Sequence, residues 1–263
     1  MWPAVEPLSS GAPLPTPLGG VVCAVIPCLD EEAAIGAVVR GVRAQGVVEV
    51  VVVDGGSRDR TAEVAHEAGA RIVLERRRGY GRALRTGIAA LPSEADIVLF
   101  IDGDGSDRPE FIPDLIRPIA EGRAAFAHGS RTRGEREAGS LSPPQLLAGW
   151  LAGVLIRVTY GVRFTDMSPY RAIHRDALDR LGMREDTYGW NLEMLMRVAA
   201  AGLPAVEIPV GQRRRAGGVS KVSGNLRASL RAAVVIATTF VRLALELRRS
   251  RADPPGAAHD SAR

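Results

Sequence analysis

The chain has 263 residues, 46% of them hydrophobic and 24% charged, which is enough apolar sequence to bury one substantial core. Its net charge of +4 suits an anionic ligand or an anionic membrane surface, but it is too small to indicate nucleic-acid binding. Aromatic residues make up only 5% and are not interleaved with basic ones, so the stacking surface of a single-strand nucleic-acid binder is absent from the pattern.

Residues 1–19 contain five prolines, no basic start and no long apolar run, which predicts a disordered leader and not a signal peptide. No stretch reaches the roughly 20 uninterrupted apolar residues of a membrane-spanning helix. Cys23 and Cys28 fit neither a zinc pattern nor a redox pair, and we expect them to be reduced core residues. These features predict a cytoplasmic protein, soluble or at most peripheral at the inner face of the plasma membrane.

The first half of the chain alternates short apolar runs with helical patterns. Strands are expected at residues 21–26, 47–53, 71–74 and 97–101, with helices at 35–42, 61–68 and 83–91 between them. This alternation predicts an α/β fold with a single, Rossmann-like, mostly parallel sheet and helices on both faces. A dinucleotide-binding site is not indicated, because Gly-x-Gly-x-x-Gly does not follow the first strand, and no Walker-type Gly-Lys-Ser occurs.

Acidic or glycine-rich turns follow three of these strands, at residues 27–31, 54–57 and 102–104. Ligands of parallel sheets bind outside the carboxyl ends of the strands, so we expect the three turns to meet at one site. Taken singly, each turn is equally explained as a helix cap or a solvated loop.

The turn after residues 97–101 carries Asp102, Asp104 and, three positions further on, Asp107. Carboxylates packed this closely repel one another unless a cation neutralises them. Oxygen ligands suit Mg²⁺ or Mn²⁺, ions that commonly bridge protein carboxylates and nucleotide phosphates. The alternative is a solvated turn, in which Asp and Gly are common.

The second half of the chain does not continue the regular alternation of strands and helices. A short strand is expected at 125–129, a mobile polar loop at 131–142, a helix at 146–158 opened by two prolines, further helices at 175–181 and from 187–190 onward, and an edge strand at 203–210. The helix at 146–158 is apolar throughout, and we prefer a buried core helix to a membrane-contacting one. The basic, glycine-bearing segment 212–221 indicates a phosphate clamp or, alternatively, a solvated charged turn.

Residues 223–249 show a basic amphipathic pattern. One face carries Leu226, Leu230, Val234, Ala237, Val241 and Leu245, and arginines lie toward the other. Such a helix can lie in an anionic membrane interface, pack on its own domain or form a homodimer, and the sequence leaves these three open. Residues 250–263 are expected to form a disordered tail.

Taken in order, the motifs resemble the family 2 glycosyltransferases of GT-A fold. They are Pro27 with Asp30 and Glu31, the 53–57 turn with Asp59 and Thr61, Gly79-Tyr80-Gly81 with Ala83 and Gly87, and Asp102-Gly103-Asp104 with Asp107, Pro109 and Glu110. Segment 166–171, Glu193 and segment 213–221 are similar to the branch of dolichyl- or polyprenyl-phosphate hexosyltransferases. The resemblance covers about residues 20–222, the expected catalytic domain.

The resemblance implies roles for individual residues. Asp102 and Asp104 would bind the Mg²⁺ or Mn²⁺ that bridges the donor diphosphate. The residues implied in catalysis are Asp104, Glu193, Asp166 and Arg213. Those implied in substrate binding are Pro27, Asp30, Glu31, Asp54, Gly56, Ser57, Gly79, Arg82, Asp102, Arg171, Arg215, Ser220 and Lys221.

Two features depart from the family pattern. The second strand ends in Asp54-Gly55-Gly56-Ser57 where the family usually has two consecutive acids, so one ligand contact is lost or made by the backbone. The polyprenyl-phosphate members often carry transmembrane helices after the catalytic domain, and this chain shows none.

The expected reaction is inverting transfer of a hexose from a UDP- or GDP-linked donor. A metal ion and arginines would stabilise the departing diphosphate. A polyprenyl-phosphate acceptor is already anionic and needs no strong base, whereas a hydroxyl acceptor would need one. Glu193 is the candidate base, with pairing to Arg197 as the alternative explanation of that residue, and Asp166 would organise the acceptor site.

Three other functions remain open at this stage. The first is transfer to a soluble or cell-wall hydroxyl acceptor, as in the sugar-phosphoglycerate synthases that share the fold. The second is a sugar-nucleotide pyrophosphorylase, for which the glycine-rich basic signature after the first strand is missing. The third is a module that binds a nucleotide sugar without catalysis.

Overall fold

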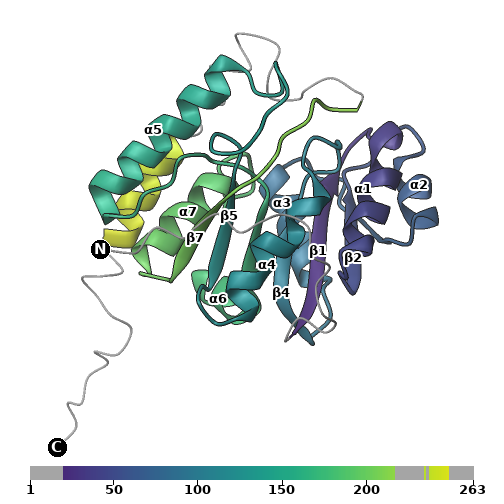
Figure 1. Ribbon diagram of the computed structural model, residues 1–263, viewed down its shortest axis with the longest axis horizontal. Coiled ribbons are helices and arrows are strands. Elements are labelled where there is room, and N and C mark those ends of the chain that lie inside the picture. Colours follow the sequence, from purple (N-terminus) through teal and green to yellow (C-terminus); the bar gives the residue numbers. More distant parts are fainter. Residues whose placement is uncertain (1–19, 217–233, 235–236, 249–263) are drawn as a thin grey trace, which may run out of the picture.

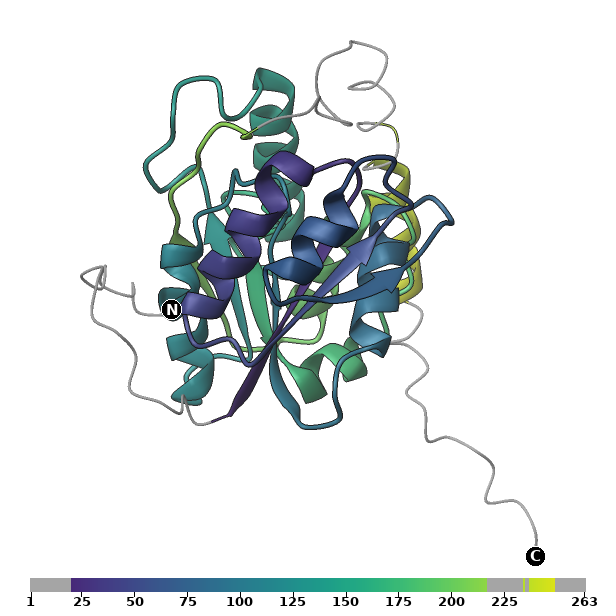
Figure 2. The same ribbon diagram turned by 90° about the vertical axis from the view of Figure 1, so that its right-hand side faces the viewer.

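The computed structural model describes residues 20–216, 234 and 237–248, and the following account concerns these (Figures 1 and 2). Seven strands form one sheet in the order β3-β2-β1-β4-β6-β5-β7. They are β1 (Val21–Cys28), β2 (Glu49–Asp54), β3 (Arg71–Leu74), β4 (Ala95–Phe100), β5 (Phe126–Ser130), β6 (Arg171–His174) and β7 (Ala205–Pro209). β6 pairs antiparallel with β4 and β5, whereas the other neighbouring strands pair in parallel, so the predicted mostly parallel sheet is confirmed.

Helices cover both faces of the sheet (Figure 1). They are α1 (Glu32–Ala44), α2 (Thr61–Glu67), α3 (Tyr80–Ala89), α4 (Ile112–Ala120), which follows the short 3₁₀ turn η1 (Pro109–Phe111), α5 (Pro143–Tyr160), α6 (Arg175–Leu181) and α7 (Trp190–Ala200). The apolar residues of α1, α2 and α4 share one core, and those of α3, α5, α6 and α7 share the other. Residues of β1 alternate between the two cores, which explains why its sequence is apolar without interruption.

Most of the expected strands are present with small shifts in their bounds. The first extends through Pro27 to Cys28, so that proline does not end it, and Cys28 pairs with Asp54 in the register of β1 and β2. β7 is at the edge of the sheet, as expected. β6 and α4 were not predicted, because residues 171–174 and 112–120 are each short and contain charged residues or proline.

The expectation that the helix at 146–158 is a buried core helix is wrong for one of its faces. Gly149, Ala152, Gly153 and Ile156 of α5 are buried against the domain. The large apolar residues on the opposite face, among them Trp150 (61% exposed) and Val158 (81% exposed), face outward. α5 is therefore a surface helix that is apolar on both sides.

Residues 237–248 are helical and pack on the domain through Leu243, which is fully buried, and through Phe240, Ala244 and Leu247. Val241 and Leu245, which the sequence placed on the apolar face, are 58% and 52% exposed. The rest of the predicted 223–249 helix, apart from residue 234, lies outside the described residues, as do the leader, the tail, Ser220 and Lys221. In the part of the chain that the structure describes, no helix is long and apolar enough to span a bilayer.

The packing of α3 on the sheet depends on the absence of a side chain at Gly87. A Cβ atom at this position would lie 2.4 Å from Cγ1 of Val25 and 2.8 Å from Cγ2 of Val53. We expect Gly87→Ala to lower the free energy of unfolding by about 1–3 kcal/mol, because the helix must move away from the sheet. Urea unfolding checks this, with Ala89→Ser on the exposed side of α3 as the control. Equal stability of Gly87→Ala and the wild type would contradict the tight packing.

Candidate active site

The three acidic turns lie together at the carboxyl ends of β1, β2 and β4, which are neighbours in the sheet. The pKa of the Cys28 thiol indicates that acidic residues from all three turns are close to one another. Burial raises its pKa well above the ordinary value, and the negative charges of Glu31, Asp102, Asp54 and Asp104 raise the pKa further. Carboxylates from all three turns are thus close enough to act on one buried sulfur atom.

The turns after β1 and β2 are tied to each other by hydrogen bonds. The Asp30 backbone N–H donates to Ser57 Oγ at 2.9 Å, and Asp30 Oδ1 accepts from the Arg58 backbone N–H at 2.8 Å. Ser57 Oγ donates in turn to Asp54 Oδ1. Asp30 adopts φ = 54°, and Gly56 adopts φ = 83°, the left-handed region that glycine enters without strain. The two turns are therefore connected into one double turn. It contains four residues that the resemblance assigns to substrate binding, namely Asp30, Asp54, Gly56 and Ser57.

The turn after β4 presents Asp102 and Asp104. Asp104 Oδ1 accepts from the Ser106 backbone N–H at 2.8 Å, and Asp102 Oδ1 accepts from the Tyr80 hydroxyl at 3.0 Å. Loss of surrounding water raises the pKa of Asp102, and the charge of Asp104 raises it further. The pKa of Asp107 is raised for the same reasons, by desolvation first and then by Asp102 and Asp104.

Two residues of this centre were not assigned roles from the sequence. Tyr80 lies between Gly79 and Gly81, and its ring stacks on Tyr188 with 6.3 Å between the centroids while its hydroxyl holds Asp102. Asp107 is 2% exposed, and its Oδ1 atom is buried without a hydrogen-bond partner among the described residues. The Asp-Gly-Asp-Gly-Ser-Asp run was a signal for Asp107, whereas the Tyr80 contact depends on how α3 packs.

The donor set fits a hard divalent cation. Burial and neighbouring aspartates both raise the pKa values of Asp102 and Asp107, and Asp107 Oδ1 has no hydrogen-bond partner among the described residues, so a cation here would stabilise the charged carboxylates. Among the described residues no group of three or more His, Cys, Asp or Glu side chains surrounds a common point. This is compatible with Mg²⁺-type binding, in which one or two carboxylates are completed by substrate phosphates and water.

A basic segment lies over the acidic turn. Arg215 contacts Asp104 Oδ2 through Nη1 at 3.1 Å and Glu31 Oε1 through Nη2 at 2.5 Å, and the Ala216 backbone N–H donates to the Asp104 carbonyl oxygen at 3.1 Å. Arg213 pairs with Glu110 at 2.7 Å, at the outer side of the segment. Of the two predicted clamp arginines that the structure describes, Arg215 is the one that reaches the acids, and it bridges the turns after β1 and β4.

Asp166 lies on the other side of the site, where it is 3% exposed and forms a two-pronged ion pair with Arg131. Nε of Arg131 lies 2.7 Å from Oδ2, and Nη2 lies 2.9 Å from Oδ1. Burial alone would raise the pKa of Asp166, but Arg131 outweighs it and lowers that pKa to about 2. The Arg131 charge also acts on Asp102 and Asp107, so the Arg131–Asp166 pair is close to the acidic turn. Arg131 was predicted only as the start of a loop.

Two sequence-predicted site residues have structural partners instead. Glu193 is fully buried and accepts from the backbone N–H groups of Arg184 and Glu185 and from Nε of Arg197 at 2.8 Å, so the pairing with Arg197 that the sequence offered as the alternative is present. Arg171 is also fully buried, and its guanidinium donates to the carbonyl oxygens of Ser168, Pro169 and Asn191. Its hydrogen bonds hold the 166–171 segment and tie it to Asn191.

Gly79 and Arg82, which the resemblance assigns to substrate binding, contact residues 185–187 in the structure. A Cβ atom at Gly79 would lie 2.3 Å from the Asp186 carbonyl oxygen, so this glycine allows the start of α3 to approach residues 185–187. Arg82 donates its backbone N–H to the same carbonyl oxygen and pairs with the Asp186 carboxylate at 2.5 Å. This segment is occupied by protein contacts.

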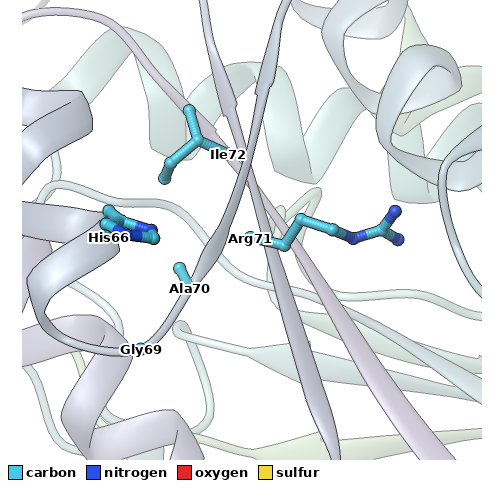
Figure 3. Close-up of a pocket in the computed structure, with 5 residues that line it drawn as sticks. All are labelled: His66, Gly69, Ala70, Arg71 and Ile72. Atoms are coloured by element: carbon cyan, nitrogen blue, oxygen red, sulfur yellow. The ribbon is translucent and has the colours of Figure 1, made fainter.

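A shallow hollow at the start of β3 is lined by His66, Gly69, Ala70, Arg71 and Ile72 (Figure 3). The Arg71 side chain points to the opposite side of the strand from His66, and it pairs there with Glu49 (Figure 3). The hollow lies at the amino end of β3, whereas the acidic turns lie at the carboxyl ends of the strands. It does not belong to the candidate active site.

An α/β sheet with acids, a basic segment and an Asp-Gly-Asp turn at its carboxyl edge is typical of proteins that bind a ligand outside the ends of the strands. The comparison with protein families is more specific: residues 23–182 match the glycosyl transferase family 2 model. The chain belongs to this family and is a glycosyltransferase of GT-A-like fold.

Relatives and solved structures agree with this assignment. An uncharacterised glycosyltransferase of Mycobacterium tuberculosis is 38% identical over 219 residues, which are 81% of this chain and 94% of that protein. A dolichyl-phosphate hexose transferase of Haloferax volcanii is 33% identical over 191 residues, 72% of this chain and 81% of that protein. The fold is similar to that of glucosyl-3-phosphoglycerate synthase from M. tuberculosis in complex with Mn²⁺, UDP-glucose and phosphoglyceric acid, with a TM-score of 0.71, 24% identity, and coverage of 86% of this chain and 80% of that one.

The acidic turn requires glycine at position 103. A Cβ atom there would lie 2.2 Å from Cys28 Sγ and 3.2 Å from Cδ1 of Ile35. We expect Gly103→Ala to destabilise the fold and displace the flanking aspartates, and Cys28→Ala to relieve part of the cost by removing the sulfur atom. Urea unfolding of both single variants and of the double variant measures this coupling. Strictly additive effects would show that the sulfur contact does not constrain the turn.

His128 on β5 lies beneath Asp166, with Nε2 3.0 Å from the Asp166 carbonyl oxygen. Burial lowers the pKa of His128 from 6.5 to about 3, so between these values the unfolded chain binds a proton that the folded protein does not. The free energy of unfolding therefore decreases as the pH is lowered through this range. We expect His128→Gln, which keeps a donor for the carbonyl, to lose less stability between pH 6.5 and 3. Thermal unfolding across this range is the measurement, and parallel curves for the two proteins would rule out a neutral buried His128.

Proposed function

We propose that this glycosyltransferase transfers a hexose from UDP- or GDP-hexose to a polyprenyl phosphate, with inversion at the anomeric carbon and dependence on Mg²⁺ or Mn²⁺. The family assignment supports sugar transfer, and the Haloferax relative supports a lipid-phosphate acceptor. The main support for a phosphate acceptor comes from the two acids that could serve as a general base, because neither is suited to accept a proton. Glu193 is enclosed by hydrogen-bond donors, and Asp166 has a pKa of about 2.

A carboxylate with so low a pKa is a poor proton acceptor at neutral pH, because efficient general bases have pKa values near the operating pH. A hydroxyl acceptor needs a base to remove its proton. A phosphate oxygen attacks the anomeric carbon as an anion and needs none. The Arg131–Asp166 pair therefore suits an acceptor phosphate better, with Arg131 supplying positive charge near the incoming anion.

On the donor side, the double turn of Asp30, Asp54 and Ser57, flanked by Pro27 and Glu31, would line the base and ribose. Asp102 and Asp104 would hold the divalent ion, which when bound would offset the negative charge of the diphosphate. Arg215 reaches Asp104 and Glu31 in the absence of donor. We infer that the guanidinium exchanges at least one of these carboxylates for a diphosphate oxygen when the donor binds, while Arg213 stays at the outer rim.

The bond changes are simple. The acceptor oxygen forms a new bond to the anomeric carbon from the face opposite the diphosphate, and the bond between that carbon and the diphosphate oxygen breaks. The electron pair leaves with the nucleoside diphosphate, so negative charge grows where Arg215 lies. Arrangement of positive charge in advance at this oxygen is the main contribution that the protein makes.

The metal-dependent step is tested with Asp104→Asn. We expect Mn²⁺ together with UDP-glucose or GDP-mannose to raise the melting temperature of the wild type but not of the variant, and kcat/KM of transfer to fall at least about 100-fold. Asp179→Asn on α6, at the opposite end of the sheet, removes one carboxylate without touching the site and should match the wild type.

The acceptor is tested by offering a short-chain polyprenyl phosphate and 3-phosphoglycerate in parallel, with release of nucleoside diphosphate as the measurement. Transfer to the polyprenyl phosphate alone supports the proposal. Preference for 3-phosphoglycerate would contradict the proposed lipid-phosphate acceptor. Undiminished transfer in excess chelator would contradict the proposed metal dependence.

A further inference from the structure

The outward face of α5 carries an unbroken apolar stripe. Its members share spacings of three or four residues and are Leu147 (62% exposed), Trp150 (61%), Leu151 (46%), Val154 (38%) and Val158 (81%). Figure 1 shows α5 as an outer helix on one side of the molecule. A continuous stripe of large exposed apolar side chains marks an interaction surface, unlike single exposed residues scattered over a protein.

The stripe is held outward by close packing on the inner side of α5. A Cβ atom at Gly153 would lie 2.1 Å from the Phe164 carbonyl oxygen, and one at Gly149 would lie 3.3 Å from Asp166 Oδ1. Rotation of the helix to bury Trp150 would bring large side chains against this backbone. The sequence thus places small residues inside and large ones outside, the reverse of an ordinary surface helix.

The charges on α5 and in the turn that follows it are positive. The only charged residue of α5 is Arg157, which is exposed, and the next along the chain is Arg163, also exposed. In residues 237–248, where Val241 and Leu245 add exposed apolar surface, the one acid is Glu246, and it pairs with Arg197 at 3.0 Å. A surface of apolar residues, one tryptophan and exposed arginines complements an anionic lipid interface.

A second copy of the chain fits this face less well. In a twofold contact the same surface meets itself, so the Arg157 residues of both copies would enter a contact in which α5 offers no acid. A bilayer surface supplies both the apolar depth and the negative charge. The stripe from Leu147 to Val158 is about 16 Å long at 1.5 Å per residue, which suits a helix lying in the interface plane.

The helix that carries the stripe also contacts the residues assigned to the acceptor. The inner side of α5 at Gly149 touches Asp166, and Asp166 holds Arg131, where the segment leading to α5 begins. A bilayer seated on the stripe is therefore separated from these residues by the width of one helix.

We propose that the outward face of α5 is a membrane-docking surface, which seats in the interface of an anionic bilayer and presents the active site to a lipid-linked phosphate. The identity of that acceptor rests on the proposed function, whereas the docking itself does not. The sequence also suggested residues 223–249 as a membrane-contacting helix. Within the described residues 237–248, the exposed Val241 and Leu245 extend the docking surface.

Vesicle flotation tests the docking with the full chain. We expect the wild type to float with phosphatidylglycerol-containing vesicles and less with pure phosphatidylcholine. Trp150→Glu combined with Val158→Glu should weaken the association at least about tenfold, because two large apolar side chains no longer enter the interface. Val48→Glu, at an apolar position that is 62% exposed near the start of β2, is the matched control and should float as the wild type does.

The double variant changes only exposed side chains, so its thermal unfolding should match that of the wild type. Equal flotation of the two proteins overturns the proposal. Failure of the wild type to float also overturns the proposal. If the wild type does not float and is a dimer that the double substitution converts to a monomer, the stripe is a dimer interface instead.

A paired activity assay separates docking from the proposed function. The double variant should keep full transfer to a short-chain, water-soluble polyprenyl phosphate and lose transfer to a long-chain acceptor embedded in anionic vesicles. Loss of both activities with an unchanged fold would overturn docking as the role of the face. If the wild type floats and the double variant does not, while neither acceptor receives sugar, the docking surface stands and the proposed acceptor fails.

Discussion

Repulsion among carboxylates at one edge of the sheet is the constraint on which the rest of the structure depends. Asp102, Asp104 and Asp107 occupy one turn, close to Asp54 and Glu31, and the pKa values of Asp102 and Asp107 are raised, first by burial and then by the charges of the neighbouring aspartates. A protein keeps such a cluster only where positive charge is supplied. Arg215 and Arg131 supply part of it, and the unpartnered Asp107 oxygen shows that compensation is incomplete. The remaining charge is what a divalent ion would neutralise.

The fold serves this cluster by bringing distant parts of the chain to it. Parallel strands place the ends of β1, β2 and β4 side by side, which short connections between antiparallel strands would not do. The antiparallel β6 then follows the Asp166 turn, so this turn reaches the sheet on a strand that runs in the opposite direction. Under the proposed function, the donor and acceptor elements would thus come from strands of opposite direction.

The sequence was sufficient for the parallel half of the sheet and for the acids at its edge, because both follow from local pattern and strand direction. It was insufficient for Glu193 and Arg171, whose burial depends on loops that pack over them. Tyr80 was likewise hidden, since its bond to Asp102 spans 22 positions and depends on the docking of α3. Periodicity recognised α5 as a helix, but could not tell which of two apolar faces would be covered. The branch of the family has support from relatives, whereas the roles of single residues remain proposals.

The bridge that Arg215 makes between Glu31 and Asp104 has a consequence for selectivity among nucleotides. A ligand that draws the guanidinium away must replace two charge-assisted contacts, which a diphosphate with its cation can do. Under the proposed function, a nucleoside or a nucleoside monophosphate that had to open the bridge would offer too few oxygens to compensate, and its apparent affinity would be reduced by that cost. The Arg215 bridge would then act as a threshold that favours intact sugar donors over degraded nucleotides.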